Sequence, residues 1–147
     1  NLSSRPSVYS AVLDTLSSVA IVSATMGKRS FDPEPYLPLT PAMFQLLVAL
    51  ADGEKHGYAI IKEVHRRTDG KVRLSAGTLY ALIKRFVQDG LIVECDERPD
   101  PALDDERRRY YRLSENGRLL ALAEAERMEE AIDQARAKLL TRKPRTA

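Results

Sequence analysis

The segment from Ser75 to Leu113 constrains the fold most, because two kinds of side-chain periodicity follow one another within it. Its first part has apolar residues at helical spacing, and two short strand-like runs follow, separated by an acidic, proline-containing loop. The apolar stripe consists of Leu79, Leu82, Ile83 and Phe86. We therefore predict an amphipathic helix that starts at Ser75 and ends at Asp89-Gly90, followed by a β-hairpin with strands at residues 91–97 and 108–113.

Two further helices are predicted before this segment. Thr40 followed by Pro41 is typical of a helix N-terminus, and Asp52-Gly53 is expected to end that helix. A second helix is predicted from Gly57 to Thr68. The apolar stripes are Phe44, Leu47, Val48 and Ala51 in the first helix and Ile60, Ile61 and Val64 in the second. Three helices and a hairpin predict a mainly α, winged helix-turn-helix domain with a two-stranded wing over residues 39–113.

A long C-terminal helix is predicted over residues 114–141, with Ser114 as its cap. Apolar and small residues recur along it at alternating spacings of four and three, which is typical of a helix that packs lengthwise on another helix. This seam consists of Ala121, Ala125, Met128, Ile132, Ala135 and Leu139, and the nearby cluster Leu119, Leu120 and Leu122 is expected to add to it. We predict a homodimer through this helix, with packing against its own domain alone as the alternative. Residues 142–147 are expected to be a basic tail.

Residues 1–38 are predicted to be an N-terminal extension. An extra helix is expected at about residues 8–26, and the closely spaced prolines from Ser30 to Pro38 predict an extended linker. The helix contains too many polar residues to match the ~20 apolar residues of a membrane span. The first 25 residues have two interpretations. They are either a native helix or, because Met26-Gly27-Lys28-Arg29 fits a natural start, a segment that is not native.

The charge distribution says more than the net charge, which is only +2. Residues 56–89 contain seven Lys or Arg against three Asp or Glu, whereas residues 115–135 contain six acidic side chains against two basic ones. The basic middle of the chain favours a polyanionic partner. The single cysteine, Cys95, excludes an internal disulfide and fits a cytoplasmic location, where it is expected to be a small strand residue.

No pattern typical of an enzyme is present in the sequence. The two histidines, His56 and His65, have no acidic or cysteine partner at metal-ligand spacing, and neither a glycine-rich phosphate loop nor a nucleophile motif occurs. We therefore expect no catalysis, no metal and no cofactor. His56 is expected in the turn before the second helix, and His65 on the surface.

Five motifs in order resemble the PadR family of bacterial winged-helix transcriptional regulators, in the short form that has a single C-terminal dimerisation helix. The matching residues are Leu46-Leu47-Val48-Ala49-Leu50, His56-Gly57-Tyr58-Ala59-Ile60, Leu74-Ser75-Ala76-Gly77-Thr78-Leu79-Tyr80, Gln88-Asp89-Gly90-Leu91-Ile92 and Arg109-Tyr110-Tyr111-Arg112-Leu113-Ser114-Glu115-Asn116-Gly117. The resemblance implies a homodimeric repressor of a palindromic operator, with release by a small-molecule effector as a further option. Ala76 departs from the family, which often has proline there, and the chain has no tryptophan with which to stack a ligand.

The helix that starts at Ser75 is the candidate recognition helix, because such a helix fits the DNA major groove and approaches base edges with its N-terminal residues. The DNA-binding candidates are Lys62, Ser75, Gly77, Thr78, Tyr80 and Lys84, with Arg107, Arg108 and Arg109 from the wing. Gly77 is expected to allow close approach, and Lys62 and Lys84 to contact phosphates. Along the second strand Arg109 and Tyr111 are expected on one face, and Tyr110 and Arg112 on the other.

Each assignment has a structural alternative. Ser75 can be only a helix cap, Tyr80 can pack against the second helix, and Lys62 can be a solvated surface charge. The arginines of the hairpin can instead neutralise the neighbouring carboxylates. For the whole chain the alternative is a winged-helix module that binds proteins, although such a module has little need for a basic recognition face. A flat apolar effector is a hypothesis for a cavity between two C-terminal helices, near Met128 and Ile132.

Overall fold

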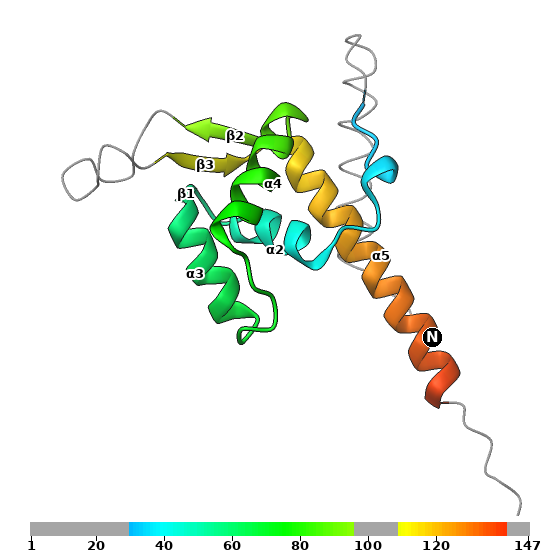
Figure 1. The fold of residues 1–147 in the computed structure, drawn as a ribbon. Coiled ribbons are helices and arrows are strands. Elements are labelled where there is room, and N and C mark those ends of the chain that lie inside the picture. Colours follow the sequence, from blue (N-terminus) through cyan, green and yellow to red (C-terminus); the bar gives the residue numbers. More distant parts are fainter. Residues whose placement is uncertain (1–29, 96–108, 141–147) are drawn as a thin grey trace, which may run out of the picture. The chain divides into compact units, whose positions relative to one another are not determined.

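The computed structural model describes residues 30–95 and 109–140, and its elements are labelled in Figure 1. The chain divides into two units, Asn1–Asp32 and Pro33–Ala147, and every helix and strand with assigned bounds belongs to the second. The helix predicted at residues 8–26, the acidic loop of the hairpin and the basic tail 142–147 lie outside the described residues.

Three helices form the core of this unit, as the sequence predicted. α2 (Pro41–Ala49) begins after Thr40, whose hydroxyl accepts a hydrogen bond from the backbone N–H of Met43 at 3.2 Å. α3 spans Gly57–Arg67 and α4 spans Ala76–Gln88. Glycines with positive φ follow α3 and α4, which is the usual way in which a helix ends.

α2 ends two residues earlier than predicted. The N–H groups of Leu50 and Ala51 bond to carbonyls three residues back, at 3.2 and 3.1 Å, so the last turn tightens and the helix stops. Ala51 is exposed, and the prediction that it belongs to the buried stripe was wrong. Leu46 and Ala49 are buried instead, because α2 packs against both α3 and α5 and needs apolar residues on two sides.

The core of the unit is apolar and lies among α2, α3, α4 and the start of α5. Its fully buried members include Leu46, Leu47, Ile60, Val64, Leu79, Phe86, Leu91 and Leu120. The centres of the helix stripes predicted from the sequence are confirmed as buried. Residues at the edges of the stripes are only half-buried, and these are Phe44, Val48, Ile61 and Leu82.

A small antiparallel sheet follows α4, with strand order β1-β3-β2. β2 (Ile92–Cys95) and β3 (Tyr110–Leu113) form the predicted hairpin, with Cys95 opposite Tyr110 and Ile92 opposite Leu113. The wing predicted with two strands has a third, β1 (Lys55–His56), which pairs with the other edge of β3. Two residues are too few to show a strand periodicity, so sequence patterning could not detect β1.

The long C-terminal helix, α5, spans Glu115–Leu140 and is anchored at its start. The Ser114 hydroxyl caps it by accepting the Gly117 N–H at 3.0 Å, and donates to the carbonyl of Gly90 at 2.6 Å. Gly117 lies so close to the backbone just before β2 that an added Cβ would be 2.1 Å from the carbonyl oxygen of Leu91. The C-terminal half of α5 runs past the other elements of the unit (Figure 1), and residues 129–140 are exposed.

The proline-rich linker is not extended throughout, which corrects the prediction. Glu34–Tyr36 form a 3₁₀ turn, η1, closed by a hydrogen bond from the Tyr36 N–H to the Pro33 carbonyl at 3.0 Å. Pro35 is tolerated there because the first turn of a helix does not need its N–H.

Candidate nucleic-acid interface

The N-terminus of α4 is built around Ser75. Its hydroxyl accepts the backbone N–H of Thr78 at 3.1 Å and donates to the Thr78 hydroxyl at 2.9 Å. Ser75 is therefore a helix cap with its proton already used. Thr78 keeps its own hydroxyl proton, so it can still donate to a base edge or a phosphate.

The predicted recognition residues lie on the exposed side of α4, opposite the buried Leu79, Ile83 and Phe86. The exposed residues are Ser75, Gly77, Thr78, Tyr80 and Lys84. Around Gly77 no atom lies within 4 Å of an added Cβ, so packing within the chain does not require a glycine there. Glycine is a poor helix former, and its presence at an open surface position favours close approach by something outside the chain.

Tyr80 satisfies both interpretations of its role. The residue is 52% exposed, yet its hydroxyl packs over Gly57, the first residue of α3, where an added Cβ would be only 2.8 Å away. The phenol is thus held in place by α3 while much of its surface faces outward. Sequence analysis did not connect these two residues, and the glycine that opens α3 was the available signal.

His56 lies directly before α3 and caps that helix, but it belongs to β1 and not to the turn that was predicted. Its Nδ1 accepts the N–H of Ala59 at 3.1 Å, and its ring meets the edge of Tyr110 at a centroid distance of 5.5 Å. The neighbouring Tyr58 is 61% exposed, and the ammonium group of Lys62 lies 5.4 Å from the centre of its ring. This pair places an aromatic ring and a cation together on the surface of α3. Tyr58 was missed because an aromatic residue at the start of a helix resembles a core residue.

The described part of the wing presents one of the three predicted arginines. Arg109 is exposed and its Nε lies 3.6 Å from Oε1 of Glu94 on β2. Pairs of this kind on the surface contribute little, so Arg109 is not withdrawn from an external anion. Arg107 and Arg108 lie outside the described residues.

Tyr110 and Tyr111, which the predicted alternation places on opposite faces of β3, are both buried. β3 is the middle strand, and the His56 ring covers Tyr110 from β1. Burial, and secondarily the Glu94 carboxylate, raises the pKa of Tyr111. The Cys95 thiol also has a raised pKa, caused first by burial, as expected for a small strand residue rather than a reactive thiolate.

The predicted dimer seam lies on the exposed face of α5. Ala125, Ile132, Ala135 and Leu139 are exposed, with Ile132 at 48% and Leu139 at 76%, whereas Ala121 and Met128 are half-buried. Leu122 is 41% exposed, but its neighbour Leu120 is fully buried in its own unit. Leu120 therefore cannot add to the seam as expected from the sequence.

The arrangement of helices, wing and long terminal helix is that of a winged-helix protein, and comparisons with known proteins agree. The family model described as the transcriptional regulator PadR-like family matches residues 46–123. The chain therefore belongs to the PadR-like family of transcriptional regulators, which bind DNA.

Solved structures share this fold. A transcriptional regulator from Clostridium thermocellum is 24% identical, with a TM-score of 0.54 over 65% of this chain and 86% of that one. A PadR family transcription regulator from hypervirulent Clostridium difficile is 23% identical, with a TM-score of 0.51 over 67% of this chain and 96% of that one. A Streptococcus transcriptional regulator is 19% identical, with a TM-score of 0.54 over 65% of this chain and 89% of that one. A search of the curated proteins finds no match.

Two other kinds of feature are absent from the described residues. Across residues 30–95 and 109–140, no helix has the length and apolar character to cross a membrane. Within the same ranges, no group of three or more His, Cys, Asp or Glu side chains is arranged to hold a metal ion.

Proposed function

We propose that this protein is a homodimeric repressor that binds a palindromic DNA operator in the cytoplasm. Residues 39–113 are the DNA-binding domain, and residues 114–141 are the dimerisation helix. The observation that carries the proposal is the exposed, polar N-terminal half of α4, where Gly77 leaves open space beside the exposed Thr78 and Tyr80. α4 enters the major groove with these residues, and Lys84 contacts a phosphate.

The dimer follows from the exposed seam on α5. One winged-helix domain contacts only a few base pairs, and two such domains related by a twofold axis contact half-sites about 34 Å apart. Burial of Ile132 and Leu139 against the same residues of a second copy removes apolar surface from water along a helix of about 39 Å. Size-exclusion chromatography with light scattering tests this step: the protein elutes as a dimer, and I132E/L139E elutes as a folded monomer.

Regulation by a small molecule belongs to the same proposal. The half-buried Met128 and the exposed Ile132 border small alanines, so two facing α5 helices leave room for a flat apolar compound. Such a compound acts as an effector only if it binds two arrangements of the dimer with different affinity. A compound screen read out by operator affinity tests this, and the absence of any compound that weakens binding contradicts it.

The DNA-binding step is tested by selecting duplexes from a random-sequence pool and measuring affinity by fluorescence anisotropy. We expect the selected sequences to be palindromic and T78A to weaken their binding, whereas R136A, at the exposed C-terminal half of α5, leaves it unchanged. The rival function is a protein-interaction module. Failure to select any sequence at physiological salt favours that rival.

A further inference from the structure

The outer side of α3 carries a shallow groove that includes Lys62, already a predicted phosphate contact, and none of the DNA-binding candidates of α4 or the wing among its lining residues. The groove has a volume of about 670 Å³ and runs from β1 along α3 to the segment that leads into α4. Its ionisable lining consists of Lys55, Lys62, Glu63, His65, Arg66 and Arg73. The apolar floor includes the half-buried Ile61 and the buried Leu74, so polar groups stand at its rim.

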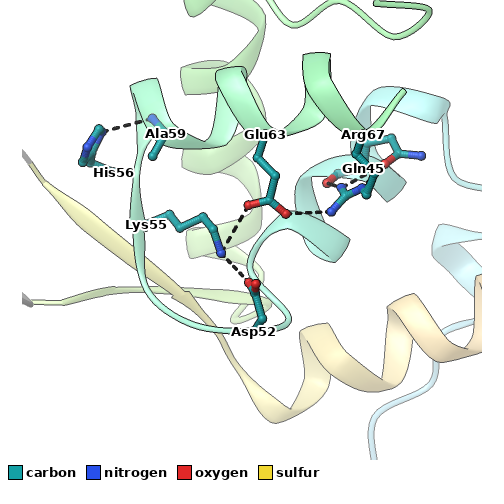
Figure 2. Close-up of polar contacts among 7 residues, drawn as sticks. All are labelled: Gln45, Asp52, Lys55, His56, Ala59, Glu63 and Arg67. Carbon is teal, nitrogen blue, oxygen red and sulfur yellow. Dashed lines mark hydrogen bonds and ion pairs between the residues drawn. The ribbon is translucent and has the colours of Figure 1, made fainter. Parts of the chain in front are cut away.

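The carboxylate in this lining is already neutralised. Figure 2 shows Glu63 between two cations: its Oε2 lies 3.3 Å from the ammonium group of Lys55, and its Oε1 lies 2.8 Å from the guanidinium of Arg67. Lys55 also pairs with Asp52, and Arg67 donates to the side chain and carbonyl of Gln45 at 2.9 and 3.1 Å. Glu63, Lys55 and Arg67 thus form an internal network that joins α2, β1 and α3.

Three cations of the groove remain outside this network. Lys62, Arg66 and Arg73 are exposed, and in the described parts of the chain none of them forms an ion pair. Lys62 and Arg66 are one helical turn apart, with Cβ atoms about 5–6 Å from each other, and like charges at this spacing destabilise a helix. The repulsion between these positive charges therefore destabilises α3 in the free protein, and binding of an anion over them relieves it.

We propose that this groove binds backbone phosphates of DNA that lie outside the base pairs contacted by α4. The inference rests on the proposed function, because α4 brings the duplex to this side of the protein. Arg73 lies two residues before Ser75, so the groove continues the surface formed by the N-terminus of α4. Phosphates recur along each strand about every 3.4 Å of axis, so two long cationic side chains one helical turn apart, such as Lys62 and Arg66, can reach different phosphates of one strand. The first helix of a helix-turn-helix crosses the backbone, as α3 does in this arrangement.

The test compares two duplexes that contain the same selected operator. The short one ends at the selected base pairs, and the long one continues for about 10 bp, one helical turn, at each end. We expect the protein to bind the long duplex more tightly and with a steeper fall of affinity with salt. R66A/R73A removes this length effect, reducing the slope of log affinity against log salt by about 0.9 for each phosphate that is no longer neutralised. Binding of the short duplex stays unchanged.

Control variants distinguish a phosphate-binding groove from a general effect of positive charge or of stability. R136A removes one exposed positive charge from the C-terminal half of α5 and is expected to keep the length effect. R66Q/R73Q removes both charges but keeps apolar side-chain stems at the two positions. This variant replaces R66A/R73A in the test if the alanine variant has a lower melting temperature. A length effect that survives in the charge-removed variants, or its absence from the unmodified protein, overturns the inference.

Two further outcomes separate failure of this inference from failure of the proposed function. If pyrophosphate at constant ionic strength raises the melting temperature of the unmodified protein but not of R66A/R73A, while duplex length has no effect, the groove takes a free anion and the inference is wrong. If the unmodified protein binds neither duplex, the proposed function itself fails. If R66A/R73A loses the length effect but still binds the short duplex, the result supports both the groove inference and the proposed function.

Discussion

The carboxylate of Glu124 and the guanidinium of Arg127 form a two-pronged ion pair on α5, with N–O distances of 2.7 and 2.8 Å. Glu124 is only 2% exposed, and the backbone N–H of Leu39, just before α2, is close enough to help lower the pKa of its carboxyl group. A second link lies one turn and a half earlier, where the guanidinium of Arg118 donates to the carbonyl of Ala51 at 3.0 Å. The Arg118 bond ties the start of α5 to the segment after α2, and Glu124 is buried near Leu39 before α2, so these contacts set the direction in which α5 leaves the winged-helix domain.

We predict that Glu124 makes stability depend on pH in the acidic range. The hydrogen bonds from Arg127, and to a lesser degree the N–H of Leu39, lower the pKa of Glu124 below its ordinary value of 4.5, against the opposing effect of burial. Because the folded pKa is the lower one, this contribution is complete above pH 4.5 and is lost as pH falls through the folded pKa. E124Q is expected to lower the free energy of unfolding at neutral pH by about 1–2 kcal/mol, a range reduced for the partial exposure of Arg127.

Urea unfolding of both proteins between pH 3 and 8 measures this difference. The gap between them should be constant above about pH 5 and narrow below the ordinary glutamate pKa. E126Q, which changes an exposed glutamate on the same helix, is the matched control and should show neither effect. A gap that does not change with pH contradicts the role given to the Glu124 charge.

The helices of the winged-helix domain could be predicted from the sequence because the residues that start and end them are local. Thr40 and Ser75 are caps at the expected positions, and the Asp-Gly pairs after α3 and α4 end those helices through glycines with positive φ. The stripe of α4 is buried as its spacing predicted, apart from its edge residue Leu82. For the candidate site, the same helical periodicity predicted which α4 residues face outward.

The features that sequence analysis missed depend on residues far apart in the chain. Glu124 is part of an acidic helix and is expected from the sequence to be a solvated charge, yet it is only 2% exposed in the folded chain, where α5 packs against α2. Packing of Tyr80 against the second helix was one of the two alternatives for this residue, but its partner Gly57 was not identified, because no periodicity within either helix encodes where α3 and α4 meet. Tyr110 is buried because β1, a strand of two residues, supplies the ring that covers it.

Gly77→Ala is predicted to stabilise the fold and weaken DNA binding. An added Cβ meets nothing within 4 Å, so alanine raises the free energy of unfolding by up to about 1 kcal/mol through better helix propensity. The same methyl group occupies the space through which α4 approaches the bases, and a loss of about 1–3 kcal/mol in binding, at least ~5-fold, is expected. Thermal melting and anisotropy measure the two effects. Unchanged or tighter binding would show that Gly77 does not face DNA.

Gly57→Ala is predicted to act through Tyr80. Its Cβ would lie 2.8 Å from the Tyr80 hydroxyl oxygen, so the ring must move and both stability and DNA affinity fall. In Y80F this oxygen is absent, and the nearest ring atom is 3.1 Å away, so the clash is largely relieved. A double-mutant cycle in unfolding free energy should therefore give a coupling of at least about 0.5 kcal/mol between the two substitutions. Additive effects would mean that alanine is accommodated by a shift of α3 itself.

Arg109→Ala is predicted to weaken DNA binding in a salt-dependent way with little effect on stability. The pair with Glu94 is exposed on both sides, so its loss should change the free energy of unfolding by less than about 1 kcal/mol. If Arg109 contacts a phosphate, the slope of log affinity against log salt becomes shallower by about 0.9. E94Q removes the competing carboxylate and should leave the slope unchanged or strengthen binding slightly, because Arg109 is then released to the DNA. The opposite pattern, in which both variants lower the melting temperature and neither alters the salt slope, would assign Arg109 to the wing's own stability.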